Sequence, residues 1–184
     1  MQQFSESLAK NFISAVESFD VQGYLDSSAE KKENLTLIHG DTNLNNVLFD
    51  SKNGSLVLID YQKSCYSNAT KDIVLFIGLS LHPHLIPQNL KVLKDFYFDN
   101  LKKNAPLGSS LDLSYSRESF ELDWIDSVKF GFLSYAVGLS LHSSQKPNEN
   151  DNPKSVKRYQ LSCIIQKRFI ALVQSEGIEN VFGK

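Results

Sequence analysis

The chain has 184 residues, of which 41% are hydrophobic and 22% charged, and 19 Lys and Arg against 21 Asp and Glu give a formal net charge of −2. This composition is typical of one folded domain with its own core, and it excludes both a disordered chain and a nucleic-acid binder that relies on a basic surface. The sequence has no apolar run of the roughly 20 residues needed for a membrane span and no signal-peptide pattern, so we expect a cytoplasmic protein without a membrane span.

The first third of the chain predicts a helix followed by short strands. Residues 4–19 place apolar side chains at helical spacing, and the polar residues 26–34 predict a loop or a short helix. Residues 35–38 are a short apolar run that predicts a buried strand. Residues 46–50 and 55–60 are strand-like, and the Asn53-Gly54 pair between them is a strong signal for a β-hairpin.

The predicted hairpin brings two polar residues to its open end. If Asn53 and Gly54 are the central residues of a two-residue turn, Asn46 lies within one residue of the position opposite Asp60. The Cα atoms of such neighbours are about 5 Å apart. We therefore expect an amide and a carboxylate side by side where the hairpin joins the rest of the chain.

The remainder of the chain predicts helices. Residues 71–81 are expected to form a buried helix that ends before Pro83, and residues 86–101 an amphipathic one. A loop over 105–114 precedes a long helix over 116–142 with Ser116 as its N-cap, and a loop over 146–153 precedes a last helix over 154–175 that Gly177 closes. The expected fold class is α+β and mainly helical.

Four polar residues converge in this arrangement: His39, Asp41, Asn46 and Asp60. Asp41 lies five positions before Asn46, which is the D-x-x-x-x-N spacing of a protein-kinase catalytic loop. Phosphoryl transfer needs such parts, because one carboxylate accepts the hydroxyl proton while an amide oxygen and a second carboxylate hold Mg²⁺. The combination of H-G-D-x-x-x-x-N, an Asn-Gly hairpin and L-I-D is a much stronger signal than His-Gly-Asp alone.

The strings LIHGDTNLNNVLFD and LVLIDYQ resemble the aminoglycoside phosphotransferase/choline kinase superfamily, and most closely its ecdysteroid-kinase-like (CHK kinase-like) branch. That branch shows HGD-x-W-x-N-N-x-x-F, then D-[FY]-Q, then D-[LI]-x-x-F-x-x-x-S, the last of which runs here from Asp72 to Ser80. The resemblance covers roughly residue 30 to the end and is most specific over 39–80. One departure is Asn43, which stands where the branch usually has Trp.

The resemblance implies an ATP-dependent small-molecule O-kinase. It implies Asp41 as the catalytic base and His39 as a catalytic-loop residue that shapes the loop. Asn46 and Asp60 would bind Mg²⁺, and Asp72 would support the loop. ATP and Mg²⁺ are the implied cofactors, and the implied partner is an alcohol substrate, with a hydrophobic one favoured.

Other residues leave two interpretations open. Leu48 and Ile59 either form the floor of an adenine site or pack inside the hairpin. Trp124 and the Phe-rich helices either line an acceptor pocket or pack in the core. His82 and His84 are better explained as a solvated helix end than as metal ligands. Cys65 and Cys163 lack metal-ligand spacing and are expected to be plain thiols, and they fit a reduced compartment.

The nucleotide-binding parts of such a kinase are not evident in the sequence. No two of the nine glycines have G-x-G spacing, and residues 1–34 predict helix and loop. We therefore expect residues 1–184 to form a single protein-kinase-like C-lobe with the N-lobe missing, made of a catalytic loop and hairpin over 35–62 and a helical substrate-side subdomain over 71–184. The alternative function is a truncated pseudokinase that binds a ligand or partner without catalysis.

Overall fold

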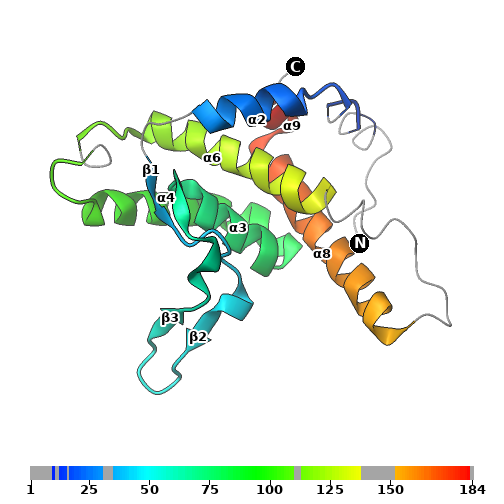
Figure 1. The fold of residues 1–184 in the computed structure, drawn as a ribbon, viewed down its shortest axis with the longest axis horizontal. Helices are drawn as coiled ribbons and strands as arrows, with labels where there is room; N and C mark the ends of the chain where they lie inside the picture. The colour runs from blue at the N-terminus through cyan, green and yellow to red at the C-terminus, as the bar shows by residue number, and fades with distance from the viewer. Residues whose placement is uncertain are drawn as a thin grey trace.

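The computed structural model describes residues 10, 13–15, 17–30, 35–109, 113–137 and 152–182. In this part of the chain the helices are α2 (Val21–Glu30), α3 (Thr70–Ser80), α4 (Ile86–Asn104), α6 (Arg117–Gly131), α8 (Pro153–Glu176) and α9 (Ile178–Phe182), and the strands are β1 (Leu35–Ile38), β2 (Val47–Phe49), β3 (Leu56–Leu58) and β4 (Cys65–Asn68). The fold is therefore α+β and mainly helical, as the sequence predicts. Figure 1 shows the β2–β3 hairpin projecting from the helical body as a separate arm.

The helical core forms where α3, α6 and α8 meet. Phe169 of α8 is fully buried, and its ring lies so close to Gly78 and Gly131 that a Cβ at either glycine would overlap it. Trp124 of α6 is also fully buried, beside Phe120 with ring centroids 5.9 Å apart. This settles the choice for Trp124, which packs in the core and does not line a pocket.

Polar contacts fix the helices against one another. Thr70, buried at the start of α3, bonds the hydroxyl of Ser127 at 2.8 Å and donates to the carbonyl of Asp123 at 2.8 Å, both on α6. Lys94 of α4 is buried between two carboxylates, 2.5 Å from Glu121 on α6 and 3.1 Å from Glu176 on α8. Because a buried ammonium needs paired charges, this triad sets the position of α4 on the other two helices.

The strands form two separate antiparallel pairs. β1 pairs with β4, with Leu35 opposite Asn68 and Ile38 opposite Cys65, while β2 pairs with β3. Strand β1 coincides with the predicted strand over 35–38. The strand is less buried than predicted, because Leu35 and Leu37 are exposed and Ile38 is its buried residue. Strand β4 was not predicted, because Cys-Tyr-Ser-Asn has no apolar alternation.

The hairpin turn differs from the predicted two-residue turn. Phe49 lies opposite Leu56, where a two-residue turn would place Leu58. A two-residue type I′ turn needs positive φ at both central residues, and of Asn53 and Gly54 only Gly54 has it. The Asp50 carbonyl instead accepts from Gly54 N at 2.8 Å, so residues 51–54 form a longer loop and the register shifts by two.

The predicted helices agree with the structure over most of the described ranges. Within the predicted helix 4–19 the described residues 10, 13–15 and 17 are helical, residues 18 and 19 are not, and the rest of that range lies outside the described residues. Residues 26–30 belong to α2. The long helix predicted over 116–142 is α-helical only to Gly131 and continues as a π-helix over Phe132–Val137, beyond which the prediction lies outside the described residues. Ser116 caps α6 as expected, accepting from Ser119 N at 3.0 Å.

Candidate active site

The segment between β1 and β2, residues 39–46, is held by one carboxylate of α3. Asp72 accepts from the backbone N–H groups of His39 at 2.7 Å and Gly40 at 2.9 Å, and from the Thr42 hydroxyl at 2.9 Å. At the other end, the Leu44 N–H donates to the Ser80 hydroxyl at 3.1 Å. Asp72 thus supports the loop, as the resemblance implied, and together with Ser80 it attaches the loop to the first and last turns of α3.

His39 has both ring nitrogens in use. Its Nδ1 accepts from the Asp41 N–H at 3.3 Å, so its Nε2 carries the hydrogen that it donates to the Ile59 carbonyl at 2.8 Å. The ring is buried and lies 4.8 Å from that of Tyr61. His39 therefore joins the loop to the chain that leaves the hairpin after β3. This contact fits a residue that shapes the loop better than it fits a general base.

Two asparagine side chains hold the backbone of Asp41. The amide nitrogens of Asn43 and Asn46 donate to the Asp41 carbonyl at 2.9 and 2.8 Å. The Asn43 oxygen also accepts from Asn45 N at 3.0 Å, which caps the 3₁₀ turn Leu44–Asn46. Asn43 therefore has a local function in the loop, although it stands where the resembled branch has Trp. The Asp41 carboxylate is left 18% exposed above this framework.

Asp60 follows directly on the residue that faces Asn46. The Ile59 N–H donates to the Asn46 carbonyl at 3.0 Å, which continues the hairpin ladder by one residue. Asp60 then adopts a left-handed conformation, φ 65° and ψ 63°, and is the one non-glycine residue with positive φ among those described. The predicted proximity of Asn46 and Asp60 at the hairpin's open end is thus present, although the register that led to it is wrong.

The donor set at this end fits Mg²⁺. Asn46 uses its amide nitrogen on Asp41, which leaves the amide oxygen as the atom available to a cation, and Asp60 offers an exposed carboxylate. Mg²⁺ prefers such oxygen ligands and takes only one or two from protein carboxylates when phosphates supply others. No cluster of three His, Cys, Asp or Glu with metal-site geometry occurs in the described part of the chain, and Asn46 and Asp60 are the residues that would hold the ion.

Lys63 is a site residue that the sequence patterns did not indicate. Its ammonium lies 3.2 Å from the Asp41 carboxylate, and this hydrogen bond is the main reason that the pKa of Lys63 lies above its usual value, with smaller contributions from Tyr135 and from the charges of Asp41 and Asp60. The Lys63 side chain is 53% exposed, so the pair contributes no more than about 1 kcal/mol to stability. Its position is set by Gly40, whose φ of 79° lets the loop pass against the Lys63 carbonyl where a Cβ would clash.

Tyr135 approaches the same pair from the helical side. It lies in the π-helical turn and stacks on Phe169, with ring centroids 6.0 Å apart. Burial raises the pKa of Tyr135, while Lys63 lowers it and Asp41 raises it, so the phenol is within electrostatic range of both. π-Helical turns are frequent at functional sites. The sequence predicted a continuous helix here and gave no sign of this residue.

Leu48 and Ile59 lie on one face of the hairpin. The register places Leu48 opposite Val57, and Asn46 opposite Ile59, so these four residues share a face by the two-residue period of a strand. Leu48 is 55% exposed and Ile59 36%. Buried packing inside the hairpin, which the sequence left equally open, does not agree with this exposure, and the adenine-floor interpretation stays a prediction.

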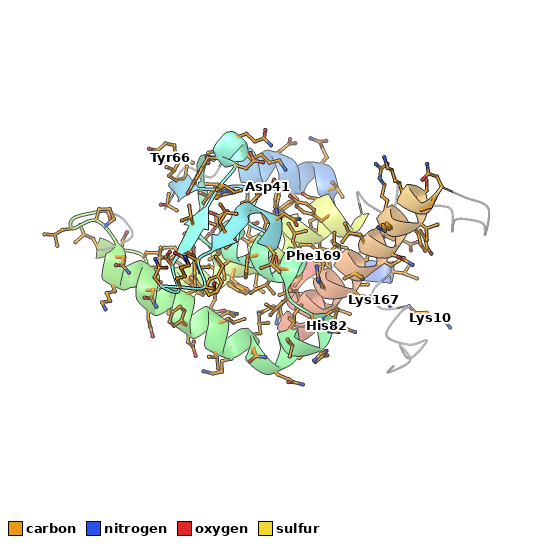
Figure 2. All side chains as sticks on the ribbon, turned by 90° about the horizontal axis from the view of Figure 1, so that it is seen from below. Lys10, Asp41, Tyr66, His82, Lys167 and Phe169 are labelled. Carbon is orange, nitrogen blue, oxygen red and sulfur yellow. The ribbon has the colours of Figure 1, made fainter. Side chains whose placement is uncertain are left out.

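The remaining sequence candidates lie elsewhere. His82 and His84 are exposed, with ring centroids 4.3 Å apart, and no metal cluster includes them among the described residues. Cys65 and Cys163 are free thiols. None of the helices within the described ranges combines the length and apolar character needed to cross a membrane. In Figure 2, Asp41 lies beside the strands and His82 lies lower in the view.

A mainly helical body with a protruding hairpin and an H-G-D-x-x-x-x-N loop at its base is the architecture of a kinase-like C-lobe. The chain belongs to the ecdysteroid kinase-like family, whose family model matches residues 1–107. This match includes residues 1–29, which the motif resemblance did not cover, and it ends before α6. No curated protein and no solved structure matches the chain.

Proposed function

We propose that the protein is an ATP-dependent phosphotransferase that acts on the hydroxyl group of a small alcohol. The observation that carries this proposal is the convergence of Asp41, Asn46 and Asp60 at the open end of the hairpin, on a loop that Asp72 braces. Membership of a kinase-like family supports the same reaction class. A hydrophobic alcohol is the favoured acceptor, by family likeness.

Each site residue has one task in this proposal. The acceptor hydroxyl loses its proton to the Asp41 carboxylate while its oxygen forms a bond to the γ-phosphorus of ATP and the bond from that phosphorus to ADP breaks. Asn46 and Asp60 would hold Mg²⁺, which when bound neutralises phosphate charge. Leu48 and Ile59 would contact the adenine, and His39 keeps the loop attached to the hairpin.

The division of the chain follows from these tasks. Residues 35–62 would form the catalytic loop and hairpin, and residues 71–184 the helical part that recognises the acceptor. Tyr135, which comes from the helical part and lies in electrostatic range of Asp41, supports this division.

The test is transfer of labelled phosphate from ATP to a panel of steroid alcohols and choline-like amino alcohols. We expect a phosphorylated product, and we expect Asp41→Asn to reduce turnover by a factor on the order of 10³ with nucleotide affinity largely retained, because the base is lost but the phosphate contacts stay. Asp99→Asn removes an exposed carboxylate of α4 and should leave turnover unchanged. Equal turnover in Asp41→Asn and the parent chain would contradict the assignment.

A second candidate function is a binding module without catalysis. It is favoured by the apolar side chains exposed on both faces of the hairpin, among them Phe49 at 65% and Leu56 at 66%. Such a surface is typical of an association site. Phosphorylation of any alcohol in the panel would exclude this alternative, whereas nucleotide binding without transfer would favour it.

A further inference from the structure

The ammonium of Lys63 lies near both kinds of carboxylate that the proposed phosphoryl transfer uses, the base and a metal ligand. It contacts Asp41, the proposed base, at 3.2 Å, and it is electrostatically coupled to Asp60, the proposed metal ligand. The transferred phosphoryl group has to lie between the acceptor hydroxyl at the base and the metal at its ligands. A cation that contacts the base and lies within electrostatic range of the metal ligand is therefore near that position as well.

Contacts on both sides of Lys63 fix the position of its backbone. The 3₁₀ turn Tyr61–Lys63 is joined to the loop by the His39–Ile59 hydrogen bond at 2.8 Å on one side and by the bond from the Ser64 hydroxyl to the His39 carbonyl at 3.4 Å on the other. Gly40 passes directly against the Lys63 carbonyl. The side chain thus starts from a fixed point beside Asp41.

The side chain itself can change partner. It is 53% exposed, and a half-exposed ion pair of this kind holds its partners only weakly. An incoming triphosphate carries more negative charge than Asp41 and offers several oxygens, so it would compete successfully for the ammonium. Release of Asp41 from the pair would then free its carboxylate for the acceptor hydroxyl.

We propose that Lys63 is the basic residue that contacts the terminal phosphoryl group of ATP in this site, with Asp41 as its partner when no nucleotide is bound. This inference rests on the proposed function and adds a phosphate-recognition residue to it. Lys63 exchanges no proton in the reaction, and its charge remains with the phosphoryl oxygens while the bond to ADP breaks and the bond to the acceptor forms.

The test compares two nucleotides that differ by the phosphoryl group in question. Calorimetric titration of the 184-residue chain with Mg·ADP and with the Mg²⁺ complex of the β,γ-imido analogue of ATP gives an affinity for each. We expect Lys63→Met to weaken binding of the triphosphate about 10- to 100-fold, the range for loss of a charge-assisted contact, with the diphosphate unchanged. Lys63→Arg, which keeps the charge, should restore most of the triphosphate affinity.

Lys91→Met is the matched control, because Lys91 also pairs with an aspartate, Asp95 at 2.7 Å, on the exposed face of α4. It should change neither affinity. Equal losses for both nucleotides in Lys63→Met, or no loss for either, would show that Lys63 only supports the loop. The inference is also overturned if the parent chain binds neither nucleotide.

The outcomes separate this inference from the proposed function. A selective loss of triphosphate affinity in Lys63→Met supports the contact even if no alcohol is phosphorylated, in which case only catalysis fails. Conversely, alcohol phosphorylation that depends on Asp41 but not on Lys63 leaves the proposed function in place and removes Lys63 from it.

Discussion

Asp72 shows how one side chain can determine the shape of the loop between β1 and β2. Its two carboxylate oxygens accept from the N–H groups of His39 and Gly40 and from the hydroxyl of Thr42, and its own carbonyl accepts from Thr42 again at 2.8 Å. These bonds make the first turn of α3 the reference point for the loop. Hydrogen bonds to a charged acceptor are stronger than those between neutral groups, so the loop conformation depends on this carboxylate more than on any single packing contact.

We expect Asp72→Ala to lower the free energy of unfolding by about 2–4 kcal/mol, because two backbone N–H groups lose a charged acceptor, while the Thr42 hydroxyl keeps the carbonyl of residue 72. Turnover should fall further than the loss of stability explains, since the residues on either side of Asp41 are then no longer bonded to the Asp72 carboxylate. Urea denaturation and phosphate transfer measure the two effects. Asp99→Ala, on the exposed side of α4, should leave both unchanged, and a stability loss as large as that of Asp72→Ala would argue against a specific role for Asp72.

At this scale the sequence predicted the residues with a spacing signature and missed those without one. His39, Asp41, Asn46 and Asp60 belong to motifs, and all four lie at the junction of loop and hairpin. Lys63 belongs to none, and it reaches the site only through the fold of the turn in which it lies. No feature of a single sequence distinguishes such a lysine from the many that are solvated.

At the scale of elements, three helices are held at short distance by two glycines and one ring. Gly78 on α3 and Gly131 on α6 both lie against the Phe169 ring of α8, which is fully buried. Glycine normally weakens a helix by about 1 kcal/mol relative to alanine. Here its lack of a Cβ is what allows the ring to fit between the two helices.

Gly131→Ala should therefore destabilise the protein by about 1–3 kcal/mol, because overlap with the ring outweighs the gain in helix propensity. Thermal or urea unfolding measures this change. Phe169→Leu makes room at the cost of a cavity, so in the double variant the two effects should be less than additive. A Gly131→Ala variant that is more stable than the parent chain would show that the helices separate without penalty.

The elements that could be predicted are those in which apolar residues recur at a regular spacing along the sequence. Helices α3, α4 and α8 lie within a few residues of their predicted ranges, and α6 begins where it was predicted but is α-helical only to Gly131. Strand β4 could not be predicted, since its pairing with β1 is the reason that Cys65–Asn68 is extended. The hairpin turn was mispredicted because Asn-Gly favours a two-residue turn, whereas the hydrogen bond from Gly54 N to Asp50 O selects a longer loop.

At the scale of the whole molecule, the helical body and the hairpin arm differ in how they are stabilised. The body buries aromatic residues completely, Phe120, Trp124 and Phe169 among them, whereas the arm exposes most of its apolar side chains. Arms of this kind contribute little to global stability. The free energy of global unfolding should therefore depend mainly on the helices. Local opening of the arm should require a much smaller free energy than global unfolding.

Alkaline pH should unfold the helical body. Burial, followed by the charge of Asp72, raises the pKa of Tyr97 to about 12 from the ordinary value of 10.0, and burial also raises that of Tyr115. A raised pKa in the folded state means that the folded protein holds the phenolic proton more tightly. The resulting stability is complete below pH 10 and is lost as pH rises through the folded pKa, by about 2–3 kcal/mol for Tyr97.

Urea unfolding at a series of pH values between 9 and about 12 measures this loss. Tyr97→Phe removes one of the titrating groups and should make the decline of stability with pH shallower, although it also gives up the 2.7 Å hydrogen bond to the Ala69 carbonyl. An unchanged slope in this variant would show that Tyr97 ionises equally well in the folded and unfolded chain.

At Asp60 the residue that would suit the backbone best differs from the residue that the proposed chemistry needs. Its left-handed conformation is one that residues with a Cβ adopt at a cost and that glycine adopts freely. Replacement by glycine would relax the turn and delete the carboxylate in a single step, so the same change favours folding and removes the proposed metal ligand. A related chain that had lost its chemistry would gain stability by drifting to glycine here. If the site remains in use, we therefore expect aspartate to be retained at this position although the backbone conformation favours glycine.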